Sequence, residues 1–179
     1  MIIEASIPLL DEILERWRPQ IGADYEGYRH HVYRMVHFCF ALRACDDDER
    51  RRIVVAACFH DLGLWSDRTV DYLAPSIARA RAYLRAAGLD HWSEEIAAMI
   101  DSHHKVTACM DPRFPLVEVF RRADLVDVSL GFVRFGVPRA YVRAVKEQFP
   151  NAGFHKRLAQ LIGAWIPSHP TSPLPFFRW

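Results

Sequence analysis

The chain has 179 residues, a length that suits one domain whose core needs no disulfide or structural metal to hold it. Hydrophobic residues make up 51% and charged residues 25%, as in ordinary globular proteins, so a disordered or fibrous class is excluded. The formal net charge of +1 offers no broad attraction for nucleic acid or an anionic membrane, and neither is expected as a partner.

Apolar residues recur at helical spacing along most of the chain, and no stretch alternates as a strand does. The fold class expected is therefore all-α in a single domain. The expected helices cover residues 6–18, 28–44, 46–61, 75–87, 93–103, 117–128, 137–149 and 154–166.

Several residues predict where these helices begin and end. Pro19 is expected to end the first helix, and the acids from Asp46 suit the start of the third because they lie near the positive end of its dipole. Gly63 is expected to let the backbone turn after the third helix. Pro75 suits the first turn of the next helix, which ends before Gly88. Either Asp90 or Ser93 is expected to cap the helix that follows.

The cysteines and the N-terminus bear on the compartment. The four cysteines form no C-x-x-C pair, and Cys39 and Cys58 fall in apolar helical stretches, so reduced structural thiols are expected. The first ten residues lack the basic start of a signal peptide, and the longest apolar run, residues 53–59, is too short to span a bilayer. A cytoplasmic location is therefore expected.

The most informative stretch is the adjacent pair His60-Asp61 near the end of the third expected helix. It offers a divalent cation two ligands of different hardness from one helical turn. Two ligands alone would bind a cation loosely, so further ligands must come from other helices. The candidates on their inner faces are His31, the His103-His104 pair and Asp124.

Each candidate also has a purely structural interpretation. A single histidine on an apolar helical face, such as His31, is often a hydrogen-bonded core residue. A buried carboxylate such as Asp124 often pairs with an arginine, and Arg121 lies one turn before it. Four such residues in one set are better explained by one site than by four coincidences.

Three motifs carry a family resemblance. They are H-x-x-R at His31 and Arg34, A-A-C-F-H-D-L-G at residues 56–63, and A-D-L-V-D-V at residues 123–128. In this order, over about residues 25–130, the chain resembles the HD-domain superfamily of metal-dependent phosphohydrolases. The resemblance implies an HD-domain-like bundle of five or more helices.

It also implies one divalent cation, held by His31, His60, Asp61 and Asp124. Two neutral imidazoles and two carboxylates would neutralise a +2 ion and leave two octahedral positions for water and substrate. Such an ion lowers the pKa of bound water to near neutral and polarises a substrate oxygen. The ligand types do not distinguish Mn, Co, Ni, Fe, Zn and Mg.

The function implied is a hydrolase acting on a small phosphorylated metabolite or nucleotide. In the family a histidine at the end of the following helix often reaches the site, on a second metal or on the substrate. Either His103 or His104 could therefore protonate the leaving group. The expected catalytic set is Asp61, His103 and His104.

The sequence departs from the family pattern in two places. Dinuclear members carry another histidine after the His-Asp pair, whereas none occurs here before His91, so one metal is favoured. The lysine of the H-D-I-G-K variant common in phosphate-handling members is replaced by Leu64. Four other cations are the candidates for binding a phosphate, namely Arg34, Arg68, Lys105 and Arg121.

Other functions stay open at this point. The run from His60 to Asp67, followed by a later Asp-Tyr and an Ala-rich helix, is similar to cyanamide hydratases. An apolar Trp65 suits a compact neutral substrate, so a hydratase or lyase is the main alternative. A di-iron oxygenase is disfavoured by the missing histidine. Asp24, seven residues before His31, nevertheless resembles a substrate-gating carboxylate of those enzymes. A metal-stabilised binding domain without catalysis is the third.

The chain divides by composition into residues 1–24, a packing helix and connection, residues 25–166, the metal-binding helical domain, and residues 167–179. The last segment has four prolines and ends in Phe176, Phe177, Arg178 and Trp179. Proline favours an extended arm. The arm could pack on its own domain, close the substrate pocket or cross to a second subunit, which leaves a homodimer open.

Overall fold

The computed structural model describes residues 2–177, which form an all-α single domain, as predicted. Short 3-10 turns, η1 (Gly22–Asp24), η2 (Asp90–Trp92) and η3 (Ile166–Ser168), connect or end some of the helices. The helices are α1 (Pro8–Ile21), α2 (Tyr25–Leu42), α3 (Asp47–Phe59), α4 (Gly63–Ser66), α5 (Leu73–Ala86), α6 (Ser93–Ser102), α7 (Leu116–Val128), α8 (Arg139–Gln148) and α9 (Phe154–Trp165).

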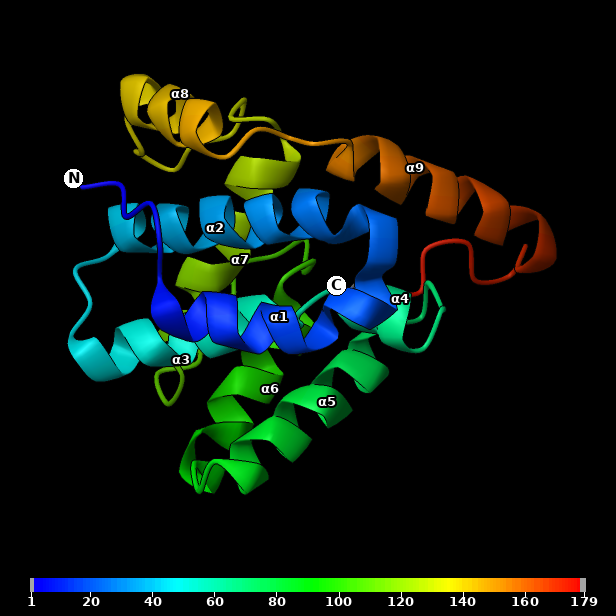
Figure 1. Ribbon diagram of the computed structural model, residues 1–179, viewed down its shortest axis with the longest axis horizontal. Coiled ribbons are helices and arrows are strands. Elements are labelled where there is room, and N and C mark those ends of the chain that lie inside the picture. Colours follow the sequence, from blue (N-terminus) through cyan, green and yellow to red (C-terminus); the bar gives the residue numbers. More distant parts are fainter. Residues whose placement is uncertain (1, 178–179) are drawn as a thin grey trace.

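Helix α2 is the centre of the bundle. It contacts α1, α3 and α7, and α8 and α9 as well. Figure 1 shows α8 and α9 along one side of α2, with α1 and α3 along the other and the α5–α6 pair beyond them. Residues from the middle of α2 therefore lie in the interior.

The core is one continuous cluster of buried apolar side chains drawn from α1 to α9. Leu10 and Leu14 of α1 belong to it and are completely buried, as are Met35 and Phe38 of α2. Among the described residues, none of the helices has both the length and the hydropathy that crossing a bilayer requires.

The start of α3 agrees with the sequence. The Asp46 carboxylate accepts a hydrogen bond of 2.8 Å from the Glu49 backbone N–H, and the Glu49 carboxylate accepts one of 3.2 Å from the Asp46 N–H. This reciprocal pair is a capping box, which satisfies two donors left free at a helix start. It fixes the first turn of the helix that leads to His60-Asp61.

The prediction that Pro19 ends the first helix is wrong, because α1 continues to Ile21. A proline so near the end of a helix removes only one backbone hydrogen bond. Burial of Ile21, which is 3% exposed, holds the last turn in place. The helix ends at Gly22, whose φ of 63° is a left-handed conformation that glycine adopts readily.

Two further boundary predictions are corrected. Neither Asp90 nor Ser93 caps α6 with its side chain, because η2 leads directly into the helix. Gly63 does not turn the backbone but begins α4, where a Cβ would lie 2.6 Å from the Tyr72 carbonyl oxygen. The glycine is needed for close approach of two backbone segments rather than for a turn.

The C-terminal segment folds back onto its own domain. After η3 the chain makes turns instead of one extended arm. Phe176 is buried, with its ring centroid 5.6 Å from that of Tyr72 and 5.0 Å from that of His104. Of the aromatic residues expected to pack here, Trp179 lies outside the described residues.

Candidate metal centre

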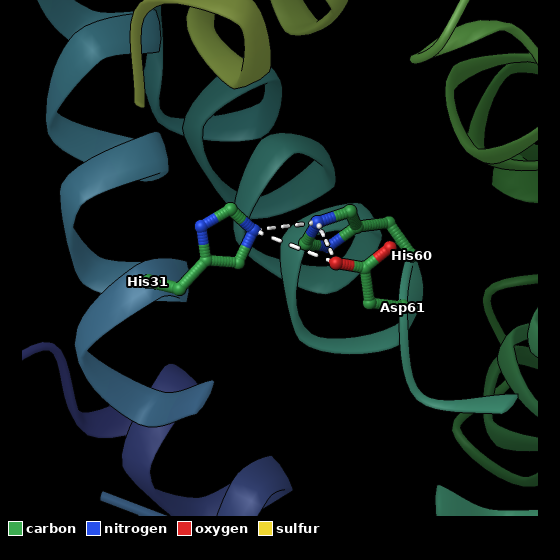
Figure 2. Close-up of side chains that lie close together, drawn as sticks. All are labelled: His31, His60 and Asp61. Carbon is green, nitrogen blue, oxygen red and sulfur yellow. Dashed lines mark hydrogen bonds and ion pairs between the residues drawn. The ribbon is translucent and has the colours of Figure 1, made fainter. Parts of the chain in front are cut away.

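The four predicted ligands come from two helices and from the turn after a third, and they lie in the interior. His31 lies in α2, Asp124 lies in α7, and His60 and Asp61 directly follow α3. All four are buried. Figure 2 shows the His31 ring directed across the gap between helices at His60 and Asp61. The structure therefore brings together the residues that the sequence predicted as one set.

The separations of the ligand atoms suit a single ion. Nε2 of His31 lies 3.0 Å from Nε2 of His60, and Asp61 Oδ2 lies 3.7 and 3.3 Å from these two atoms. Asp124 Oδ1 is farther away, 3.8 Å from His31 Nε2 and 4.0 Å from His60 Nε2. Ligands about 2.1 Å from an ion are about 3 Å apart at right angles and about 4 Å apart when opposite. The distances among His31, His60 and Asp61 fall within that range, and these three residues form one group that could hold an ion. Asp124 lies within reach of the two histidines but is not part of that group.

Hydrogen bonds on the far side of each ring fix which nitrogen carries a proton. His60 Nδ1 lies 2.8 Å from the carbonyl oxygen of Ala57, which can only accept, so this nitrogen is the donor. His31 Nδ1 likewise donates to Asp127 Oδ2 at 2.7 Å. In neutral rings the two Nε2 atoms are then bare lone pairs, facing each other beside a carboxylate. Lone pairs repel unless a cation lies between them, so the donor set fits a metal ion.

A second group of ligand atoms adjoins the first. His103 Nδ1 donates to the Ile100 carbonyl at 2.6 Å, which leaves Nε2 bare and 3.4 Å from Asp61 Oδ1. Both of these atoms are buried without a hydrogen-bond partner among the described residues. Ligand atoms of Asp61, His103 and His104 all lie within 4.8 Å of one another. Asp61 thus presents one oxygen to each group.

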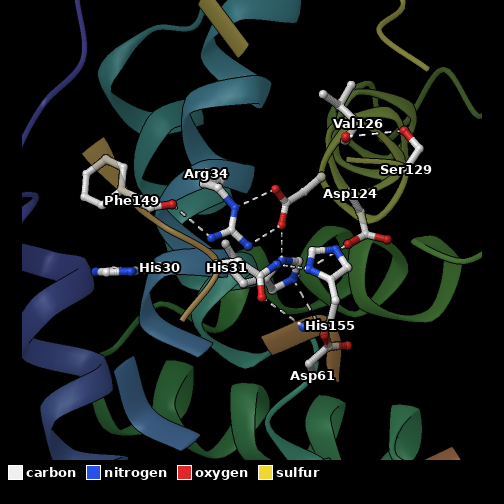
Figure 3. A network of polar contacts seen from close by, with 12 residues as sticks. His30, His31, Arg34, Asp61, Asp124, Val126, Ser129, Phe149 and His155 are labelled. Carbon is white, nitrogen blue, oxygen red and sulfur yellow. Dashed lines mark hydrogen bonds and ion pairs between the residues drawn. The ribbon is translucent and has the colours of Figure 1, made fainter. Parts of the chain in front are cut away.

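Asp127 orients His31 from behind. Its carboxylate accepts the His31 bond and two more from the Arg34 guanidinium, at 2.6 and 2.8 Å. Burial opposes ionisation of Asp127, but these hydrogen bonds and the Arg34 charge outweigh it and hold its pKa well below the usual range. Figure 3 shows Arg34 in this network beside His31, with a further bond to the Phe149 carbonyl. Such carboxylate-to-histidine contacts fix a metal ligand's tautomer and orientation.

The pKa values suit two of the ligand roles. Burial lowers the pKa of His31 to about 4, so its ring is neutral near pH 7, as a ligand must be. Burial, aided by the charges of Asp61 and Asp127 and opposed by His103, raises the pKa of Asp124 to about 8. A neighbouring cation would favour the ionised form of Asp124.

A cavity of about 540 Å³ opens beside the ligand cluster. Asp124, His103, His104 and Tyr72 lie at its polar end. The Tyr72 hydroxyl and His104 Nε2 are 2.7 Å apart, and His104 Nδ1 is 3.5 Å from Asp124 Oδ2. Both histidines therefore line the cavity, and His103 directs its Nε2 toward Asp61.

Of the four cations predicted to bind substrate, only two line the cavity beside the ligand cluster. Lys105 and Arg121 line the cavity, but Arg121 donates to Glu118 at 2.8 Å through both Nε and Nη2. Arg34 is buried behind His31 and pairs with Asp127, so it supports a ligand instead of meeting a substrate. Arg68 lines a different cavity, of about 680 Å³. The structural interpretation that pairs Asp124 with Arg121 is wrong, since the partner of Arg121 is Glu118.

Sequence reasoning missed Asp127 and Tyr72. Asp127 lies three residues after Asp124, and Arg34 three residues after His31, so each pair shares a helix face. That spacing on two helices could have predicted the Arg34–Asp127 pair. Asp24, weighed as a substrate gate, accepts hydrogen bonds from Trp65 Nε1 at 2.9 Å and Arg157 Nε at 2.8 Å.

Comparison of the chain with protein families, with curated proteins and with solved structures found no match in any of the three.

Proposed function

We propose that this protein is a metal-dependent hydrolase of the HD-domain kind that acts on a small organic phosphate. The observation that carries the proposal is the pair of bare Nε2 lone pairs, on His31 and His60, that face each other 3.0 Å apart beside Asp61. His31, His60, Asp61 and Asp124 would hold one divalent cation. When bound, it would supply a water of lowered pKa and polarise a phosphoryl oxygen.

The reaction proposed is attack of a water oxygen on phosphorus, with breakage of the bond from phosphorus to the alcohol oxygen. Protons must leave the water and reach the departing alcohol. His103 and His104 both line the cavity, but His103 directs its Nε2 toward Asp61, whereas the His104 ring forms a hydrogen bond of 2.7 Å with Tyr72. His104 is therefore the group proposed to carry these protons.

Lys105 is the group proposed to bind the phosphate. It lines the cavity, and its side chain has no hydrogen-bond or ion-pair partner among residues 2–177. Arg121 is less suited because Glu118 already neutralises it. Lysine acts as a point charge toward phosphate, and here it stands directly after His104 in the chain.

The test begins with elemental analysis of protein purified without a chelator or metal-affinity tag. One equivalent of a divalent metal is expected in the wild type, and a large loss in His31→Gln and Asp124→Asn. Phosphate release from p-nitrophenyl phosphate and nucleoside monophosphates is then measured with Mn, Co, Ni and Mg. Full occupancy without turnover by any metal would refute the hydrolase, and unchanged metal content in both variants would refute the site.

The cavity wall supports a second candidate, a hydratase or lyase for a neutral molecule. Away from the ligands the wall is mainly aliphatic and aromatic, which suits an uncharged substrate. A volume of about 540 Å³, however, is large for a molecule as small as cyanamide. Zinc content together with hydration of a nitrile or cyanamide, without phosphate release, would favour this candidate.

The second ligand group bears on the metal count. Asp61, His103 and His104 could hold a further ion that shares Asp61 with the first. Two irons per chain and an optical absorption band after aerobic purification would favour an oxygenase over a hydrolase. One equivalent of metal would support the single-ion site.

A further inference from the structure

We infer that the substrate carries an extended apolar group, which binds along the cavity beside the metal centre and under the C-terminal segment of residues 174–177. This inference rests on the proposed function, since it names the class of phosphate ester that the same site would accept. The ester would be that of an alkyl or aryl alcohol rather than of a sugar.

The cavity has two chemically different parts. One part is polar, where Tyr72, His104 and Asp124 lie side by side at the ligand cluster. Helices α4, α7 and α9 and the loop before α5 supply most of the rest of the wall. The side chains there that carry the argument are Leu64, Val70, Leu125, Leu158, Leu161 and Ile162.

A sugar or other polyhydroxyl group would fit this wall poorly. Its hydroxyls would lose hydrogen bonds to water and find few partners among aliphatic side chains, which weakens binding. A hydrocarbon group would instead gain about 0.8 kcal/mol for each methylene buried. The wall therefore selects for an apolar alcohol.

The charge at the polar end fits an anionic head on that apolar body. Two cations line the cavity, Lys105 and Arg121. Arg121 pairs with Glu118, whereas Lys105 has no ion-pair partner in the described part of the chain. Lys105 lines the same cavity as His104 and directly follows it in the chain, and we assign the phosphate to this cation. A phosphate there would leave its alcohol group pointing along the aliphatic wall.

The C-terminal segment closes the cavity on one side. Phe176 is 6% exposed and packs against Tyr72 and His104. Phe177 also lines the cavity, with its ring centroid 6.0 Å from that of His104, yet it is 43% exposed. Phe177 is therefore free to cover an apolar group that extends from the metal centre.

The test uses n-alkylphosphonates of two, four, six and eight carbons, which cannot be hydrolysed, and calorimetric binding to the full chain loaded with Mn²⁺. The dissociation constant is expected to fall about tenfold for every two methylenes added. Phe177→Ala and Leu161→Gln should each weaken octylphosphonate at least about fivefold while leaving ethylphosphonate unchanged. Phe132→Ala is the matched control, since Phe132 is 86% exposed and lines none of the cavities described above.

A dissociation constant that does not depend on chain length would overturn the inference, as would glucose 6-phosphate binding more tightly than octylphosphonate. Equal binding of the octyl compound by wild type and by both variants would do the same. Because no turnover is measured, a protein that binds the series but releases no phosphate would refute the proposed hydrolase alone. A phosphatase indifferent to chain length would refute the present inference alone.

Discussion

Asp127 would not contact a bound cation itself, but it orients the His31 ring, which would. Its carboxylate accepts a hydrogen bond from the Nδ1–H of His31, which leaves Nε2 as the bare nitrogen toward His60 and Asp61. It also neutralises Arg34, which is 1% exposed and would otherwise be a buried unpaired charge. One side chain thus links the tautomer of a ligand to the stability of the α2–α7 contact.

We expect Asp127→Asn to lower metal affinity about 10- to 100-fold, because an amide holds the His31 tautomer less firmly. It should also lower the free energy of unfolding by about 3–5 kcal/mol, since the Arg34 charge stays buried. Mn²⁺ titration and urea unfolding measure the two effects. Asp111→Asn is the control, because that carboxylate lies on an exposed loop beside Arg113. Wild-type affinity in a folded Asp127→Asn protein would contradict the orienting role.

At the scale of elements, α3 carries the site at its end and is fixed at its start. Asp46→Ala removes one half of the capping box and should cost about 1 kcal/mol of unfolding free energy. Asp47→Ala removes a neighbouring acid that makes no cap and should cost less. Urea unfolding of the two variants side by side checks this, and equal losses would mean that the charge rather than the cap stabilises the helix.

Two helical glycines give opposite predictions for the same substitution. Gly63→Ala would place a Cβ 2.6 Å from the Tyr72 carbonyl oxygen, so we expect a loss of about 1–3 kcal/mol through overpacking between α4 and α5. Gly163→Ala in α9 meets nothing within 4 Å and should raise stability by up to about 1 kcal/mol, because alanine favours the helix. Thermal and urea unfolding measure both. A stabilising Gly63→Ala would show that the two segments can separate without cost.

For the whole molecule, acid should weaken the contact that joins the loop at residues 105–115 to α7. Burial opposes ionisation of Glu118, but hydrogen bonds from Arg121, the Cys109 backbone N–H and Arg122 outweigh it and lower its pKa to about 2 from an ordinary 4.5. Between these values the unfolded chain binds more protons than the folded one, so stability falls as the pH falls. The contribution is complete above about pH 5 and lost as the pH drops toward 2.

The variant that checks this is Glu118→Gln. Its deficit in unfolding free energy relative to wild type should be largest near pH 7 and shrink steadily from pH 5 to pH 2.5, in urea unfolding at each pH. Glu147→Gln, at an exposed position of α8, controls for the loss of one negative charge. A deficit independent of pH would mean that Glu118 stabilises the fold without its charge.

The sequence by itself determined the main helices of this protein and a candidate set of metal ligands, although it did not predict the short helix α4. Apolar spacing predicts helices because one face of each must be buried, and His31, His60, Asp61 and Asp124 stand on such faces where an unpaired polar group would be costly. Helix ends were harder to predict, as Pro19 and Gly63 show, because burial and close packing overrode local preference there.

Only the tertiary structure decided what surrounds those ligands. Asp127 and Tyr72 act on His31 and His104 from other helices or loops, and Arg34 and Arg121 are taken up by carboxylates that spacing alone did not assign to them. The apolar cavity is formed by segments far apart in the chain, including the C-terminal one. Periodicity reports which face of a helix is buried, whereas the partner on the other side of that face depends on how the helices pack.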